Sequence, residues 1–225
     1  MNSPSNNGAA FIGAASTDNN GAFIGAGATS VCVPFTIDTE VFLQNCNDFT
    51  ARFPEQAARL GLNRPETALQ CLQAVPPAYR LVQAKAKGME HTPTLAVNGS
   101  FVHSKYNPQE EARRILDSEF FQTAEAQSRC IFTGLGLGYL ASQYIERFPA
   151  AEAVIIEADR DIFLCCLAAR RLDSLFRHRR LSLLIGTQPE EAASFLASTG
   201  WNNKILFKAP VSSETYKPWY GTFFT

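Results

Sequence analysis

A short apolar run, a glycine-rich turn and an amphipathic segment follow one another between residues 129 and 148, and this order constrains the fold most strongly. Arg129–Thr133 has the length of a buried strand, and Gly134, Gly136 and Gly138 follow it directly. Apolar residues at helical spacing come next: Tyr139, Leu140, Tyr144, Ile145 and Phe148. A strand that enters a helix through a glycine turn is typical of nucleotide-binding α/β folds, because a backbone without Cβ atoms lets a ligand approach closely.

The same alternation continues to the end of the chain. We expect strands at Ala153–Ile156, Leu181–Ile185 and Lys204–Phe207, with helices around Ile162–Ala169 and Pro189–Ala197 between them. Strands that alternate with helices favour a parallel sheet with right-handed crossovers. The predicted fold class is therefore α/β. Residues 127–225 are predicted to form a partial, truncated Rossmann-type unit with a methyltransferase-like sheet.

The turn and the next strand end together form a candidate nucleoside site. Glu157 ends the second strand, 19 residues beyond Gly138, and an acid there is placed to accept hydrogen bonds from ribose hydroxyls. The candidate cofactor-binding residues are Gly134, Gly136, Gly138 and Glu157, for a nucleoside ligand such as S-adenosylmethionine or a CMP sugar. We expect a valine at Gly136 to block such a ligand and to leave the fold largely intact. The alternative is that the glycines serve only close packing.

Three segments precede this unit. Residues 1–30 are a low-complexity run of Asn, Gly, Ala, Ser and Thr, which predicts a disordered tail. Residues 31–91 form a predicted N-terminal helical region, with helices from Asp38 and from Pro54. Residues 92–126 contain a predicted hairpin, Thr94–Val97 and Ser100–His103 around Asn98-Gly99, and a connecting helix from Pro108 through about Phe121.

The charge and the residue composition limit the classes of partner, membrane and metal that the chain can bind. The chain has 20 basic and 21 acidic residues, so it lacks the positive charge that binding nucleic acid requires. No apolar run is long enough to cross a membrane, and no Lys or Arg precedes Arg52 to start a secretory signal, which predicts a cytoplasmic protein. The cysteines and histidines show no spacing typical of a metal site, so no metal is expected.

The glycine turn followed by an acid resembles the S-adenosylmethionine-dependent methyltransferases, and the preceding hairpin and helix resemble the aminopropyltransferases that make spermidine. Those aminopropyltransferases carry an acid after the fourth strand, whereas this chain has Lys208-Ala209-Pro210. The third strand ends in Gly186-Thr187, without an acid or amide for an adenine. Only 15 residues follow Pro210, too few for the three further strands of such a sheet. The sequence therefore gives the chemistry of that superfamily little support.

A second resemblance is more specific. Residues 94–108, TLAVNGSFVHSKYNP, followed by Glu110-Glu111-Ala112, resemble the "NG…HSKY(D/N)P…EA" signature in the N-terminal region of the motility-associated-factor (Maf) flagellin glycosyltransferases. The run Gly134–Tyr139 and the segment Phe49-x-x-Arg52-Phe53-Pro54 are similar to the same family in the same order. The resemblance covers roughly residues 38–210.

This resemblance implies a function. Maf proteins transfer nonulosonic acids from CMP sugars to flagellin in the bacterial cytoplasm, and their transferase domain lies after the region matched here. The chain is expected to be an accessory domain without catalytic residues of its own, with flagellin or a catalytic glycosyltransferase domain as its partner. Its candidate ligand or partner contacts are His103, Ser104, Lys105 and Tyr106. The alternative for His103, at the end of a strand, is a structural hydrogen bond. Two alternatives stay open: a methyltransferase-like or aminopropyltransferase-like nucleoside-binding protein, and a non-catalytic protein-interaction domain.

Overall fold

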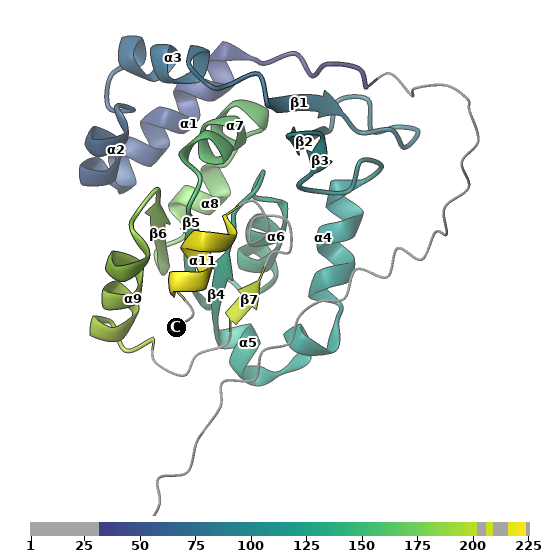
Figure 1. Ribbon diagram of the computed structural model, residues 1–225. Helices are drawn as coiled ribbons and strands as arrows, with labels where there is room; N and C mark the ends of the chain where they lie inside the picture. Colours follow the sequence, from purple (N-terminus) through teal and green to yellow (C-terminus); the bar gives the residue numbers. More distant parts are fainter. Residues whose placement is uncertain (1–31, 202–205, 209–215, 224–225) are drawn as a thin grey trace, which may run out of the picture.

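A four-stranded parallel sheet forms the centre of the molecule (Figure 1). The computed structural model describes residues 32–201, 206–208 and 216–223, so the expected tail at 1–30 and the start of the expected last strand lie outside the described residues. The strands are β4 (Arg129–Thr133), β5 (Glu152–Glu157), β6 (Leu181–Ile185) and β7 (Leu206–Lys208). They lie in the order β6-β5-β4-β7, and every neighbouring pair is parallel. The predicted α/β class and the partial Rossmann-type sheet are confirmed.

Alternate residues of these strands enter two different apolar clusters, which give the sheet a helical layer on each face. Phe132 and Ile155 belong to the larger cluster, which also contains the buried sides of α1 (Thr39–Arg52), α6 (Tyr139–Arg147) and α7 (Arg160–Ala169). Ile131, Val154 and Ile156 belong to the smaller cluster, with residues of α9 (Pro189–Ser198) and α11 (Lys217–Phe223). This period of two is what a strand buried on both faces requires.

The N-terminal helices protect one edge of the sheet. Asp38 caps α1 by accepting a hydrogen bond from Glu40 N at 2.9 Å, and Pro54 begins α2 (Pro54–Leu60), as the sequence predicts. A proline also begins α3 (Pro65–Gln73). Gln56 and Arg59 of α2 donate side-chain hydrogen bonds to backbone carbonyls of the edge strand β6. These bonds occupy backbone groups through which another strand could pair.

A small antiparallel sheet joins the molecule beside α7 (Figure 1). It contains β1 (Tyr79–Gln83), β2 (Pro93–Val97) and β3 (Ser100–Phe101). Asn98 and Gly99 both have positive φ, 51° and 84°, which confirms the predicted two-residue turn. The predicted second strand is too long, because the paired residues end at Phe101 and His103 contacts Leu137 instead of continuing the hairpin.

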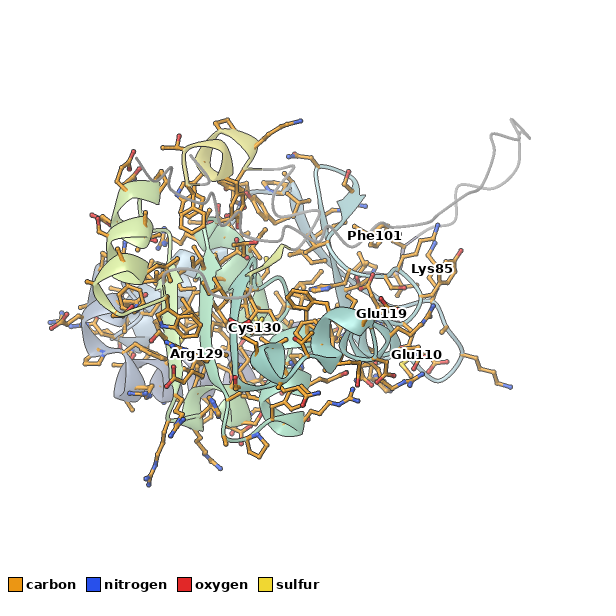
Figure 2. All side chains as sticks on the ribbon, turned by 90° about the horizontal axis from the view of Figure 1, so that it is seen from below. Lys85, Phe101, Glu110, Glu119, Arg129 and Cys130 are labelled. Atoms are coloured by element: carbon orange, nitrogen blue, oxygen red, sulfur yellow. The ribbon has the colours of Figure 1, made fainter. Side chains whose placement is uncertain are left out.

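The connecting helix is also shorter than predicted. α4 (Pro108–Leu116) begins at the expected proline but does not reach Phe121, because Ser118 is extended and its hydroxyl donates to Ile115 O at 2.6 Å. A 3₁₀ helix, η1 (Glu119–Gln122), and α5 (Ala124–Ser128) follow. Glu110 of α4 and Glu119 of η1 lie on the same side of the molecule as Phe101 of the hairpin, away from Cys130 of β4 (Figure 2).

A single apolar cluster connects all these parts. It contains Phe42 and Phe49 of α1, Leu95 of β2 and Leu116 of α4, together with residues from the parallel sheet. The apolar cluster therefore continues across positions 91 and 126, where the sequence predicts segment boundaries. The boundaries themselves stay a prediction.

Candidate functional site: the glycine turn at the carboxyl edge of the sheet

The predicted glycine turn links β4 to α6. Gly134, Gly136 and Gly138 have φ values of 113°, 54° and 75°, a region that other residues rarely adopt. The turn leaves β4 beside the end of β5, because the two strands are parallel and in register from Arg129 opposite Glu152. This is the edge at which open parallel sheets bind ligands.

Glu157 fills the turn from the neighbouring strand. Its Oε2 accepts hydrogen bonds from Leu135 N at 2.8 Å and Gly136 N at 3.3 Å, and its Oε1 accepts one from Asp159 N at 3.1 Å. The residue is 1% exposed, and burial raises its carboxyl pKa to about 7, although the backbone donors act in the opposite direction. Glu157 therefore lies at the predicted place, but its oxygens are already engaged by the turn itself.

His103 fills the turn from the other side. Its Nε2 accepts a hydrogen bond from Leu137 N at 2.7 Å, so the ring proton is assigned to Nδ1, which lies 3.9 Å from Glu111 Oε2. Burial, assisted by the positive charge of Arg170, lowers the His103 pKa to about 4. The imidazole is therefore neutral near pH 7 and acts as a hydrogen-bond acceptor.

The His103 ring explains why position 136 is glycine. A Cβ atom on Gly136 would lie 2.7 Å from His103 Cε1, closer than two carbon atoms normally approach, and a tight 3.1 Å from Val102 Cγ1. The expectation that valine at this position leaves the fold largely intact stays a prediction, and the contacts around Gly136 argue against it. The space that glycine provides is taken by a side chain of the same protein.

The other residues of the HSKY segment have separate roles. Ser104 Oγ accepts from Tyr106 N and Asn107 N, each at 3.2 Å, and Ser104 N donates to Glu111 Oε2 at 2.8 Å. These bonds shape the link between hairpin and α4. Lys105 Nζ lies 5.1 Å from the centre of the Tyr106 ring, and Tyr106 is 55% exposed. Of the four predicted contact residues, only His103 reaches the glycine turn, while Tyr106 lies on the surface.

A group of tyrosines that sequence reasoning missed surrounds the end of β5. Tyr79 OH donates to Asp159 Oδ2 at 2.7 Å, and Tyr216 is hydrogen-bonded to both Tyr79 and Asp159. Tyr220 of α11 is only 2% exposed. Tyr79 and Asp159 are 80 residues apart in sequence, so no local pattern reports their contact.

The polar groups at this edge of the sheet bond mainly to one another, and we call this arrangement the joint. It brings together two buried acids, Glu157 and Asp159, a neutral histidine and the N–H groups of the glycine turn. Among the residues that the structure describes, no group of three His, Cys, Asp or Glu side chains is placed to hold a metal ion. Within the same residues, no helix is long and apolar enough to cross a membrane.

The fold and the site define a Rossmann-like α/β unit that carries a small antiparallel sheet. No family model matches the chain. A protein of Treponema pallidum (strain Nichols), named only as an uncharacterized protein, is 38% identical over 182 residues, which is 81% of this chain and 60% of that protein.

The structure of a Maf glycosyltransferase from Magnetospirillum magneticum AMB-1 is similar with a TM-score of 0.50 and 18% sequence identity, over 77% of this chain. This likeness shows a Maf-like fold. The chain spans about three fifths of the Treponema protein and about one third of the Maf structure.

Proposed function

We propose that this chain is an N-terminal accessory domain of a Maf-type glycosyltransferase, which modifies flagellin with nonulosonic acids in the bacterial cytoplasm. In this role the domain holds flagellin or the catalytic domain in place and does not perform the transfer. The observation that carries the proposal is the contact between His103 and Leu137. It joins the two segments that resemble the Maf family, the HSKY link and the glycine turn, in one structural unit. The Maf-like fold supports the same proposal.

The occupied turn favours an accessory role over nucleoside chemistry. Glu157 and His103 already accept from the N–H groups of Leu135, Gly136 and Leu137, which are the donors that a ligand at the turn would use. The methyltransferase-like and aminopropyltransferase-like alternatives need these groups to be accessible. They therefore gain less support from the geometry than the accessory role does.

Tyr106 offers a place to test the partner. It is an exposed aromatic residue beside Lys105, and such residues often dominate the binding energy of protein interfaces. We expect Tyr106→Ala to weaken binding to unmodified flagellin or to a Maf catalytic domain by about tenfold or more, measured by biolayer interferometry. Val33→Ala is the matched control, because Val33 is similarly exposed at 54% and lies outside the HSKY link.

A separate assay tests whether the domain lacks transferase activity. We expect the purified chain to transfer no sugar from a CMP-nonulosonate to flagellin, because the resemblance covers only the region before the family's transferase domain. Turnover by the chain alone would contradict the accessory role. A failure to bind either partner would instead favour the remaining alternative, a protein-interaction domain with a different partner.

A further inference from the structure

Exposed arginines gather at the amino end of β6, the opposite end of the parallel sheet from the glycine turn. Arg180 directly precedes this strand, and Arg177 ends the short helix α8 (Asp173–Arg177) just before it. Arg52, in the last turn of α1, donates from Nη2 to Arg179 O at 2.9 Å, so its side chain reaches the same place. We call Arg52, Arg177, Arg179 and Arg180, all of them exposed, the arginine face.

Acidic side chains neutralise only part of the arginine face. Arg180 Nη1 lies 3.9 Å from Glu152 Oε1, but the other oxygen of Glu152 lies closer, at 2.8 Å, to Arg129 Nε. Arg177 Nη1 lies 3.6 Å from Asp173 Oδ2. These are long or shared contacts of exposed groups, and such pairs contribute little to stability.

The other two arginines of the face have no acidic partner. In the part of the chain that the structure describes, no ion pair reaches Arg52 or Arg179. The hydrogen bond from Arg52 ends on a backbone carbonyl, which carries no net charge. The arginine face therefore keeps an excess of positive charge, although the chain as a whole has a net charge of −1.

Helix dipoles explain only half of this arrangement. A cation in the last turn of a helix is stabilised by the free carbonyls there, which accounts for Arg52 in α1 and Arg177 in α8. Arg179 and Arg180 follow α8 and belong to no helix, so this reason does not apply to them. Like charges on one small surface repel one another, and an external anion would remove that repulsion.

The kind of anion follows from the surroundings. Guanidinium groups form paired hydrogen bonds with carboxylates, so an acidic protein segment fits them well. Nucleic acid is a poor fit because the chain has no overall positive charge. A membrane surface is a poor fit as well, since the exposed large apolar residues of the described chain lie in the segment before α1 and in the HSKY link.

We propose that the arginine face binds an acidic segment of a partner protein, whose carboxylates pair with Arg52 and Arg179. It is a second contact surface, separate from the HSKY link. Lys85 N donates to Lys105 O of that link at 2.9 Å, and Figure 2 shows Lys85 far from Arg129, which begins the central strand β4. The inference goes beyond the accessory role and does not rest on it.

The test measures binding of a fluorescein-labelled hexaglutamate peptide to the full chain by fluorescence anisotropy. The first variant combines Arg52→Gln with Arg179→Gln and so removes the two guanidinium groups that lack ion pairs. The matched control combines Arg64→Gln with Arg80→Gln. Both control residues are exposed, make no ion pair within the described residues and lie in other elements, so the change in net charge is the same.

The proposal predicts that the first variant binds the peptide about tenfold more weakly than the wild type, whereas the control changes by less than about twofold. Binding to the wild type should also weaken as salt is raised from about 50 to about 300 mM. Equal weakening in the two double variants would overturn the proposal, because it would show an effect of net charge alone. Binding to phosphatidylserine vesicles without binding to the peptide would assign the face to a membrane and would overturn it as well.

A single variant keeps the test valid if the double variant folds poorly. Arg179→Gln leaves the bond from Arg52 intact, because that bond ends on the backbone carbonyl of residue 179. Its thermal unfolding should match that of the wild type, and the peptide should bind about threefold more weakly. Unchanged binding by Arg179→Gln would contradict the proposal.

Discussion

His103 Nε2 accepts a hydrogen bond from the Leu137 backbone at 2.7 Å, and this contact ties the small antiparallel sheet to the parallel sheet. The two residues are 34 positions apart in sequence. One belongs to the link after β3 and the other to the glycine turn after β4. Because of this contact, a turn that resembles a ligand site instead joins the link after β3 to the turn after β4.

Substitution of Gly136 should destabilise the fold because of both strain and overlap. Its φ of 54° disfavours any side chain, and a Cβ would overlap the His103 ring. We expect Gly136→Ala to lower the free energy of unfolding by about 3 kcal/mol or more in urea denaturation. Gly99→Ala is the matched control, since Gly99 has a φ of 84° but open space around it, and it should lose only about 1–2 kcal/mol.

A double variant separates the two causes. In the Gly136→Ala background, His103→Ala should cost less than it does in the wild type, because the smaller side chain also removes the overlap. Equal losses from Gly136→Ala and Gly99→Ala, with no coupling to His103, would mean that strain alone determines the result.

Glu157, which is buried, and His103, which is largely buried, should have opposite effects on stability as the pH changes. The folded protein holds the Glu157 proton more tightly, with the pKa raised from 4.5 to about 7, so the contribution of Glu157 is complete below pH 4.5 and is lost as the pH rises to about 7. The His103 pKa falls from 6.5 to about 4, so its contribution is complete above pH 6.5 and is lost as the pH falls toward 4. The two slopes oppose each other between pH 4.5 and 6.5.

Removing one group should reveal the slope of the other. The unfolding free energy of Glu157→Gln, taken relative to the wild type, should rise by up to about 3 kcal/mol between pH 4.5 and 7. His103→Gln should show the reverse trend, with its relative stability rising as the pH falls below 6.5. Denaturation curves at several pH values measure both. Differences that stay constant with pH would show that neither group has a shifted pKa.

Asn45 should be among the most sensitive polar residues outside the turn. It is fully buried in α1, donates to Leu167 O and Arg170 O at 2.7 Å each, and accepts from Leu172 N at 3.0 Å. Asn45→Ala leaves these backbone groups unsatisfied and should cost about 3 kcal/mol in thermal or urea unfolding. Gln44→Ala removes only an exposed hydrogen bond to Asp48 and should change stability by less than about 0.5 kcal/mol. Similar losses in the two variants would contradict this role.

The sequence predicts the elements here better than it predicts their contacts. The glycine turn, the parallel order and the Asn98-Gly99 hairpin follow from local spacing and from the backbone freedom of glycine. The extended Ser118 that ends α4 early depends on a side-chain hydrogen bond, which periodicity does not report. Tyr79 and Tyr216 meet at Asp159 only through the tertiary fold. The sequence predicts the position of Glu157, but it does not predict that Glu157 accepts hydrogen bonds from the turn.

The protonation state of His103 tests the joint most directly. Long-range ¹H–¹⁵N correlation spectra of the ¹⁵N-labelled chain report the tautomer and pKa of each histidine, and His91 and His178 provide internal references. The joint predicts a neutral His103 with its proton on Nδ1 down to about pH 5, and a pKa near 4. A His103 that titrates near pH 6.5, or that carries its proton on Nε2, would show that the ring does not accept from Leu137 and would contradict the joint.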